Sequence, residues 1–499
     1  MTVQSLPNFI KKRAFLTPDR PAIHFEGLTL TFKQLYERSV DYAGRLTLKG
    51  IKKNSCTAVL MKNHLDTVVI LFALQLLGTK TIMLNTRLTR AEMTWQLSDS
   101  RAEFLLTESS FMVEGEKAEM EFLSLTVLSK EELAESESVN PLLVEEIVLT
   151  DICTIMYTSG TTGQPKGVMQ TFGNHWWSAM GSALNLGFME SDCWLCTVPL
   201  FHISGFSILM RSVIYGMSIV LHENFDENKA IEDIFTKKVT IMSVVSTMLT
   251  RITESFGDRI MPVHFRCMLL GGGPAPLTML EKCIDIGIPV FQSYGMTETA
   301  SQIVTLSPED SLVKLGSAGK PLFPAQLKIQ SEDGSLAAAG KAGEIAVKGP
   351  NITPGYLHRP DATANKLREG WLYTGDIGYV DQDGFLYVLD RRDDLIISGG
   401  ENIYPAEIEG VLLSHPDVAD AGVVGVPDAR WGQVPVAFIA AKNGTVLADG
   451  MLKEYCQERL AKYKLPSTFI FLDELPRNAA KKLLRRNLRD MWQKDRQET

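Results

Sequence analysis

Short apolar runs rich in β-branched residues alternate with longer stretches of helical periodicity along residues 21–306. Strand-like runs separated by longer helical stretches are typical of parallel sheets with crossover helices. The longest apolar run, residues 67–77, is too short to cross a bilayer, so we expect a buried helix or strand there. The strands predicted by this pattern are residues 57–61, 102–107, 219–221, 239–245, 267–270 and 290–292.

The hydrophobic pattern changes beyond residue 316, where short strand-like runs are bounded by Gly and Asp. This pattern predicts a small antiparallel β subdomain with strands at 326–329, 343–347, 371–374 and 385–389. A charged run, residues 390–394 (DRRDD), follows it. Beyond that run the pattern predicts a helix opened by proline at 405–415 and strands at 418–424 and 434–441.

The whole pattern predicts an α/β protein with two domains. Residues 1–390 would form a large N-terminal domain of parallel sheets with crossover helices, plus the small β subdomain. Residues 391–499 would form a smaller α+β C-terminal domain. A length of 499 residues agrees with this division, because chains of this size usually split into more than one domain.

Composition argues against several classes of protein. The formal net charge of −9 argues against a general nucleic-acid binder, which needs a basic surface. Residues 1–16 lack the apolar segment of a secretory signal, and the seven scattered cysteines suggest reduced thiols. We therefore expect a cytoplasmic enzyme without integral membrane association. Cys193 and Cys196 form a C-x-x-C without a second pair, which favours core packing over a zinc or redox site.

The first chemical motif is residues 157–167 (YTSGTTGQPKG), which follow the strand-like run 152–156. Its glycines let the backbone approach an anion closely, its hydroxyls donate hydrogen bonds, and Lys166 supplies positive charge. Pro165 stands where a Walker A loop has glycine, so the loop is of another kind. A solvent-exposed turn is the alternative that this loop alone leaves open. The candidate phosphate-binding residues are Thr158, Ser159, Gly160, Thr161, Thr162, Gly163 and Lys166.

The loop resembles the phosphate-binding signature of the adenylate-forming superfamily, which includes acyl-CoA synthetases, luciferases and peptide-synthetase adenylation domains. Further signatures of that family follow in the same order. They are an adenine and magnesium motif at 294–298 (YGMTE), a ribose motif at 373–376 (YTGD), a hinge at 390–393 and a catalytic-lysine region at 476–482. The resemblance spans residues 158–482 and implies binding of ATP and Mg²⁺, with CoA as a co-substrate.

Within residues 294–298, the resemblance places adenine against Tyr294 and Gly295, and an aromatic ring offers a large stacking surface. Thr297 would donate to the α-phosphate, and Glu298 offers a hard oxygen ligand to Mg²⁺. Both are therefore candidate catalytic residues. The alternative is a simple turn in which Tyr294 belongs to the core and Glu298 is merely exposed.

The ribose motif contributes Asp376, whose carboxylate can accept hydrogen bonds from two ribose hydroxyls. Arg391 would bond the ribose or the phosphate region. Taken alone, Asp376 could be an ordinary turn aspartate, and Arg391 could belong to a surface ion pair.

The resemblance also implies that the C-terminal domain is mobile. Asp393 would be the hinge between an adenylating and a thioester-forming pose, and residues 399–405 (GGENIYP) would swing in to line the pantetheine tunnel. Lys482 would stabilise charge that develops during adenylation. Lys481 stands where the family usually has glycine, and the start of a basic helix is the alternative interpretation of this region.

The acid pocket should lie between residues 199–211, 271–274 and 299–302. His202 resembles the gating histidine of the family, although a lone histidine is often structural. Arg211 lies at the predicted edge of this pocket. The candidate pocket residues are His202, Ser204, Gly271, Gly272, Ala300, Ser301 and Gln302.

Three tracts, residues 199–205, 270–276 and 294–302, resemble those of one member of the family, whose acid carries a second carboxylate on an aromatic ring. A purely apolar pocket would leave that carboxylate unpaired. Serine, glutamine and histidine side chains in these tracts supply polar groups, directly or through water. The tracts contain neither lysine nor arginine, so the sequence leaves recognition of a diacid open.

The sequence therefore predicts an acid–thiol ligase that adenylates an acid with ATP and passes the acyl group to CoA. A synthetase for another aryl or medium-chain acid and a stand-alone adenylation protein that loads a carrier protein are alternatives. A nucleotide-binding regulatory protein with decayed chemistry is a third, and the presence of every motif residue argues against it. A homo-oligomer is left open.

Overall fold

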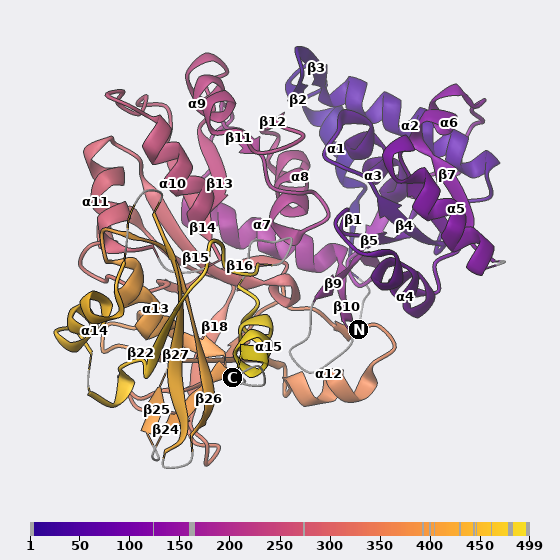
Figure 1. The fold of residues 1–499 in the computed structure, drawn as a ribbon. Helices are drawn as coiled ribbons and strands as arrows, with labels where there is room; N and C mark the ends of the chain where they lie inside the picture. Colours follow the sequence, from indigo (N-terminus) through magenta and orange to yellow (C-terminus); the bar gives the residue numbers. More distant parts are fainter. Residues whose placement is uncertain are drawn as a thin grey trace.

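The computed structural model describes residues 4–122, 124–158, 165–272, 275–391, 394–398, 401–403, 405–428, 431–442, 445, 447–460, 462–477 and 483–495. All structural statements below concern these residues. They build two large sheets with their helices, a small antiparallel sheet and a C-terminal sheet (Figure 1). A two-stranded sheet of β1 (Ser5–Pro7) and β8 (Glu146–Val148) lies beside them.

The first large sheet has seven strands in the order β20-β10-β9-β5-β4-β6-β7. Strands β4 to β7 and β9 run parallel, whereas β10 and β20 are antiparallel additions at one edge. The strands are β4 Cys56–Leu60, β5 Lys80–Met83, β6 Phe104–Thr107, β7 Thr126–Ser129, β9 Ile152–Thr158, β10 Lys166–Thr171 and β20 Gly355–Tyr356.

The second large sheet has nine strands in the order β17-β16-β15-β14-β13-β11-β12-β2-β3. Its interior strands run parallel, and β16, β17 and β3 are antiparallel. The strands are β2 Pro21–Phe25, β3 Leu28–Thr31, β11 Cys193–Cys196, β12 Ser218–Leu221, β13 Ile241–Val245, β14 Cys267–Gly271, β15 Val290–Met296, β16 Ser301–Leu306 and β17 Lys320–Pro321. Parallel sheets with crossover helices are thereby confirmed.

Helices connect and cover these two sheets. They are α1 Phe9–Leu16, α2 Phe32–Leu48, α3 Leu65–Leu77, α4 Arg90–Ser100, α5 Met112–Glu121, α6 Lys130–Glu135, α7 Phe172–Leu186, α8 Ile203–Tyr215, α9 Glu227–Thr236, α10 Ser246–Ser255 and α11 Leu277–Asp285.

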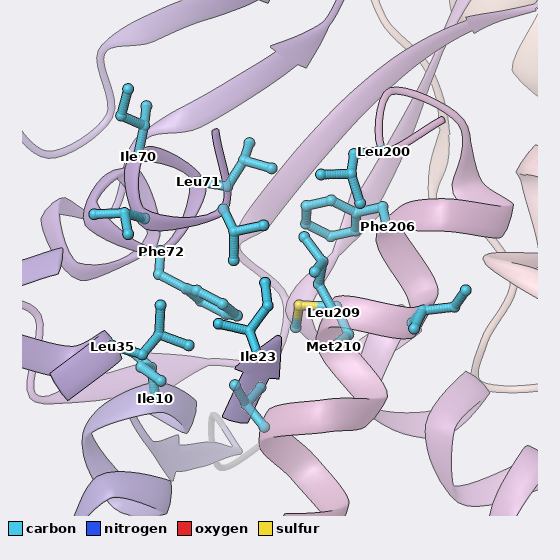
Figure 2. Packing of buried hydrophobic residues seen from close by; sticks show 14 of the residues in the cluster. Ile10, Ile23, Leu35, Ile70, Leu71, Phe72, Leu200, Phe206, Leu209 and Met210 are labelled. Atoms are coloured by element: carbon cyan, nitrogen blue, oxygen red, sulfur yellow. The ribbon is translucent and has the colours of Figure 1, made fainter. Parts of the chain in front are cut away.

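Helix α3 forms the centre of the largest apolar cluster. Every residue of α3 except Asp66 is buried, as expected for a helix that is apolar on all sides. Phe72 of α3 packs in the same cluster as Phe206 and Met210 of α8, and Figure 2 shows the two helices meeting through these side chains. The apolar run 67–77 is therefore a buried helix, and α8 is held rigidly beside it.

The small antiparallel sheet contains β18 Gln326–Gln330, β19 Gly343–Lys348, β21 Leu367–Arg368, β22 Trp371–Val380 and β23 Leu386–Arg391, with α12 Pro360–Lys366 beside it. Strand β22 is longer than the predicted 371–374, because Asp376 to Val380 pair with Arg391 to Leu386 of β23. Asp376 therefore lies within a paired strand, and the interpretation as an ordinary turn aspartate is wrong.

The C-terminal part forms a sheet with a core of its own. Its elements are β24 Ile396–Ser398, β25 Glu401–Ile403, α13 Pro405–Leu413, β26 Val418–Asp428, β27 Gly432–Ala441, α14 Asp449–Gln457, β28 Thr468–Phe471 and α15 Arg485–Asp495. Buried residues of α13, α14 and β26 pack together in one cluster. The α+β character predicted for this part is confirmed (Figure 1).

The C-x-x-C cysteines belong to the core. Cys193 and Cys196 are both buried in β11, and they lie in two separate apolar clusters. Burial raises the pKa of Cys193 to about 11 and that of Cys196 to about 12, and both thiols are free. Core packing is confirmed over a zinc or redox role. No helix within the described ranges is long and apolar enough to cross a membrane.

Candidate active site

The described ends of the predicted phosphate loop, Thr158 and Lys166, belong to β9 and β10 of the seven-stranded sheet. Strand β9 ends at Thr158, and β10 returns antiparallel from Lys166, so these two residues face each other in register. Ser159, Gly160, Thr161, Thr162 and Gly163 lie outside the described residues. The Nζ of Lys166 lies over the ring of Tyr356, 5.7 Å from its centroid. The structure therefore places the two described loop residues together.

The second motif continues from β15 into a short 3-10 turn, Thr297–Thr299, and then into β16. Glu298 accepts a hydrogen bond from the hydroxyl of Tyr356 at its Oε1 (2.9 Å). The carboxylate is therefore fixed by a partner rather than free on the surface. Glu298 is half-buried, so the part of the alternative that leaves it merely exposed is wrong, whereas Tyr294 does pack against an apolar cluster, as that alternative expected.

Five successive main-chain carbonyl oxygens in this segment, residues 297 to 301, are each held by a donor; we call this set the carbonyl cradle. The donors are Gln170 Nε2 to Thr297 (2.7 Å), Thr353 N to Glu298 (2.8 Å), Asn351 Nδ2 to Thr299 (2.8 Å), Ser178 Oγ to Ala300 (2.6 Å) and Thr299 Oγ1 to Ser301 (2.6 Å). Carbonyls paired one by one with fixed donors hold a backbone in one conformation.

The cradle holds a backbone that is otherwise unfavourable. Ala300 and Ser301 both have positive φ, 51° and 112°, which is rare for residues with a Cβ and costs about 1–3 kcal/mol each. The neighbouring strands also come so close that a Cβ on Gly295 would lie 2.2 Å from the carbonyl oxygen of Ser301. Only glycine fits at position 295, and Ser301 is turned by this geometry toward α8.

The adenine and ribose candidates lie side by side. The hydroxyl of Tyr294 donates to Oδ2 of Asp376 (2.7 Å), and Asp376 is buried. The backbone of Arg391 pairs in register with that of Asp376 across β22 and β23. Three residues predicted from motifs far apart in the sequence therefore meet at one place.

The acid-pocket candidates gather at α8 and the start of β16. Ser204, Ser207 and Arg211 are spaced three and four residues apart on α8 and so share one face of the helix. Nη2 of Arg211 donates to Oγ of Ser301 (3.2 Å), and the two serine hydroxyls of Ser207 and Ser301 lie 3.5 Å apart. Ser204, at the exposed first turn, is the outermost of this row.

Arg211 is the cation of this site. Its side chain is only 1% exposed, and its guanidinium lies over the ring of Trp194, 5.0 Å from the centroid. Burial lowers the pKa of Arg211, yet guanidinium stays charged in proteins. No described Asp or Glu pairs with it, and its Nε has no hydrogen-bond partner. Packing of α8 against β11 and β16 buries Arg211 next to Ser301, and the prediction that Arg211 lies at the edge of the acid pocket stays a prediction.

His202 caps the start of α8 and is neutral at ordinary pH. Burial, together with the positive charge of Arg87, lowers the pKa of His202 to about 4. Its Nε2 is buried without a hydrogen-bond partner. A neutral imidazole can bind an acid by a hydrogen bond but cannot balance its charge.

The remaining pocket candidates contribute less directly. Gly271 ends β14, and a Cβ there would lie in ordinary van der Waals contact with Ser293 Oγ (3.6 Å), while Gly272 has a φ of 90°. Gln302 is buried, and its amide donates to Thr305 (3.1 Å) rather than to the Arg211 cluster. Lys482 and Asp393 lie outside the described residues, as do Lys481 and residues 399–400.

We next asked which of the described residues could bind a divalent cation. They contain no group of three or more His, Cys, Asp or Glu side chains that could bind a metal by themselves. Mg²⁺ usually takes one or two carboxylates and completes its shell with water and substrate phosphates. The fixed carboxylate of Glu298, next to the phosphate-loop lysine, fits that requirement.

The chain belongs to the AMP-binding enzyme family. The profile of that family matches residues 10–357, and that of the AMP-binding enzyme C-terminal domain matches residues 407–482. A 2-succinylbenzoate–CoA ligase of Geobacillus kaustophilus is 56% identical over 495 residues, which is 99% of each chain.

Solved structures extend this similarity to three dimensions. The o-succinylbenzoate CoA synthetase (MenE) of Bacillus subtilis, in complex with the acyl-adenylate intermediate OSB-AMP, superposes with a TM-score of 0.93 at 50% identity, covering 98% of this chain and 99% of that one. The same Bacillus subtilis enzyme in complex with ATP and a magnesium ion gives a TM-score of 0.92 at 50% identity, covering 97% and 100%.

Proposed function

We propose that the chain is an AMP-forming acid–thiol ligase that converts 2-succinylbenzoate (o-succinylbenzoate), ATP and CoA into o-succinylbenzoyl-CoA, AMP and pyrophosphate in menaquinone biosynthesis. The observation that carries the choice of acid is the buried guanidinium of Arg211. A buried cation without an anion is costly, and a ring carboxylate on the substrate would supply the missing charge. The names of full-length relatives support the same acid.

In the first step, the succinyl carboxylate attacks the α-phosphorus of ATP, the α–β bond breaks, and pyrophosphate leaves. We assign charge stabilisation at the α-phosphate to Thr297 and Lys482. Lys166 and the loop residues 158–163 would hold the β- and γ-phosphates. Tyr294, Asp376 and Arg391 would bind the adenosine, so that the α-phosphate and the carboxylate meet at the fixed segment 297–301.

We assign Mg²⁺ to Glu298. Bound there, the ion would neutralise charge on the phosphate oxygens as pyrophosphate departs. Tyr356 keeps the Glu298 carboxylate aimed, and Thr353 holds its main chain.

In the second step, the CoA thiol attacks the carbonyl carbon of the mixed anhydride, and AMP leaves. We propose that the C-terminal domain turns about Asp393 between the two steps, with the domain boundary between residues 390 and 391. The boundary falls one residue before β23 ends at Arg391, and β24 then begins a different sheet. We also propose a cytoplasmic location, which the free thiols of all seven cysteines support.

ATP–pyrophosphate exchange with a panel of acids tests the proposal. We expect exchange with 2-succinylbenzoate and little with benzoate, 4-oxo-4-phenylbutanoate or octanoate. Adding CoA should then give free acyl-CoA and AMP in equal amounts. Equal exchange with the keto acid that lacks the ring carboxylate would contradict the choice of acid.

The second candidate is a synthetase for another aryl or medium-chain acid. Gly271 and Gly272, where no side chain projects at the end of β14, would also admit a different acyl chain. The same panel separates the two functions, since a medium-chain enzyme would respond to octanoate. Transfer of the acyl group to a carrier protein, with no free acyl-CoA released, would indicate the stand-alone adenylation protein.

A further inference from the structure

Tyr356 contacts two parts of the predicted nucleotide site at once, although it belongs to none of the motifs in the sequence. Its hydroxyl donates to Oε1 of Glu298 (2.9 Å), and its ring lies under the Nζ of Lys166 (5.7 Å to the centroid). The side chain is only 7% exposed. Residues 166 and 298 are far apart in the sequence, and Tyr356 lies between their side chains.

We infer that Tyr356 is a positioning residue that aims Glu298 at the divalent cation and places Lys166 for the nucleotide's phosphates. This inference rests on the proposed function, and in particular on the assignment of the metal to Glu298. A phenol that donates to one carboxylate oxygen leaves the other oxygen able to bind a cation. Partners that orient a metal-binding carboxylate usually affect metal affinity strongly.

The fold fixes Tyr356 from three directions. Strand β20 pairs with β10, with Tyr356 opposite Val168, so the ring lies diagonally across from Lys166 on the same face. The main-chain N–H of Tyr356 donates to Oγ1 of Thr363 in α12 (3.0 Å). Three residues earlier, the N–H of Thr353 donates to the carbonyl oxygen of Glu298 (2.8 Å). The segment 353–356 therefore holds both the main chain and the side chain of Glu298.

The chain offers a matched control in Tyr157. This tyrosine lies on β9, in the same hairpin as Lys166, and its hydroxyl also donates to a carboxylate, Oδ2 of Asp99 (2.9 Å). Asp99 in turn pairs with Arg359 and has no contact with Glu298 among the described residues. Tyr157→Phe therefore removes a similar hydrogen bond at the same hairpin without touching the metal carboxylate.

The test measures binding of Mn²⁺ to the full-length protein with α,β-methylene-ATP, followed by the electron paramagnetic resonance signal of free Mn²⁺. Tyr356→Phe should weaken Mn²⁺ binding by about 10- to 100-fold, and Tyr157→Phe should leave it within about twofold. In pyrophosphate exchange, the Mg²⁺ concentration for half-maximal rate should rise for Tyr356→Phe alone. Unchanged Mn²⁺ binding in Tyr356→Phe, or equal weakening in both variants, would overturn the inference.

A second variant tests the placement of Lys166. Tyr356→Phe keeps the ring and should leave the affinity for metal-free ATP unchanged, whereas Tyr356→Leu removes the ring and should weaken it. If Tyr356→Leu does not fold, Tyr356→Phe alone decides: a lower affinity for metal-free ATP in that variant would overturn the inference that the ring of Tyr356 places Lys166. Because Mn²⁺–nucleotide binding needs no acid, a wrong choice of acid would abolish exchange but leave these results intact.

Discussion

Under the proposed function, Arg211 is the residue on which the choice of acid depends. Its guanidinium is buried over Trp194, and its described hydrogen bonds go to neutral hydroxyls, those of Ser301 and Tyr215. A buried charge that lacks an anion destabilises the free protein, and an anionic ligand relieves that cost. Stability and substrate recognition are therefore opposed at this position.

We predict that Arg211→Met keeps or raises the melting temperature of the free protein while it impairs recognition of the diacid. A charge-assisted hydrogen bond contributes about 1.5–3 kcal/mol, so KM for 2-succinylbenzoate should rise by roughly 10- to 150-fold with little change in KM for ATP. Exchange kinetics and thermal denaturation, each measured with and without the acid, check both parts.

The keto acid without the ring carboxylate is the control for Arg211→Met. Wild type should discriminate strongly against it, and the variant should hardly discriminate at all. If kcat/KM of the variant falls by the same factor with both acids, Arg211 stabilises the fold of the pocket and does not bind the ring carboxylate of the substrate.

His202 is the residue whose protonation depends on pH in this pocket. Its pKa in the folded protein is about 4, below the ordinary 6.5, so unfolding takes up a proton between these two values. Neutral His202 therefore contributes to the free energy of unfolding. This contribution is complete above about pH 6.5 and is lost as the pH falls toward about 4, by at most about 1.4 kcal/mol per pH unit.

We predict that His202→Gln reduces the loss of thermal stability between pH 7 and pH 5, because glutamine takes up no proton. Part of the acid sensitivity should remain, because burial also lowers the pKa of His175, to about 3. Unfolding therefore makes His175 take up a proton as well. Melting temperatures across this range check the prediction. An unchanged slope in His202→Gln would mean that His202 titrates normally in the folded protein.

At the scale of elements, the segment from β15 through β16 organises the site. The carbonyl cradle fixes residues 297 to 301 from α7, β10 and the 349–353 loop. The same donors determine where Thr297, Glu298 and Ser301 point. Removing one hydrogen bond of the carbonyl cradle should therefore lower kcat/KM even where the fold is kept.

We predict that Ser178→Ala lowers kcat/KM for the acid by about 5- to 30-fold, because it removes the donor to Ala300 (2.6 Å), a bond worth about 1–2 kcal/mol. Ser182→Ala is the matched control, since Ser182 is buried one turn later on α7 and interacts with Tyr215. It should lower the melting temperature with a smaller effect on kcat/KM. Equal kinetic losses in both variants would argue against the cradle.

Much of this element level is predictable from the sequence, and the failures have physical reasons. Alternating apolar runs locate β13 and β14 closely, because burial on both faces demands such runs. The extension of β22 past Asp376 is missed because Thr-Gly-Asp has turn composition, and pairing with β23 overrides it. Tyr356 is missed because its role arises from β20 pairing with β10, which no local pattern encodes.

Arg211 is missed for a similar reason, although a signal exists. Ser204, Ser207 and Arg211 recur at helical spacing on a mostly apolar helix, which marks one polar face. The sequence analysis brings residues 199–211 and 299–302 to one pocket, but it does not predict that Arg211 is buried there against Ser301. The motif residues Glu298 and Asp376 are predicted correctly as neighbours of other site residues because each sits at a strand or its end, where the sheet order brings them together.

At the scale of the whole molecule, the fold class follows from the hydrophobic pattern, and the resemblance carried by the motifs implies the two-step chemistry. A TM-score of 0.93 over nearly the entire chain means that the C-terminal part sits relative to the rest as it does in the OSB-AMP complex of the Bacillus subtilis enzyme. The proposed second pose requires that part to turn. Contacts between α13 and β23 would have to change in that movement.

We predict that Asp393→Pro leaves pyrophosphate exchange nearly intact and abolishes transfer to CoA, because proline restricts the backbone rotation that the hinge needs. Lys482→Ala is the complementary variant, since it should abolish adenylation but spare thioester formation from supplied acyl-adenylate. Both half-reactions are measured separately for each variant. Loss of both halves in both variants would refute the assignment of one residue to each step.

The carbonyl cradle has a further consequence for how such enzymes differ from one another. Its bonds end on main-chain oxygens, so they do not depend on which side chains stand at positions 300 and 301. Those side chains, together with residue 211, can be exchanged while the backbone keeps its path. Under the proposed function, the scaffold would separate the part that performs the nucleotide chemistry from the side chains that select the acid.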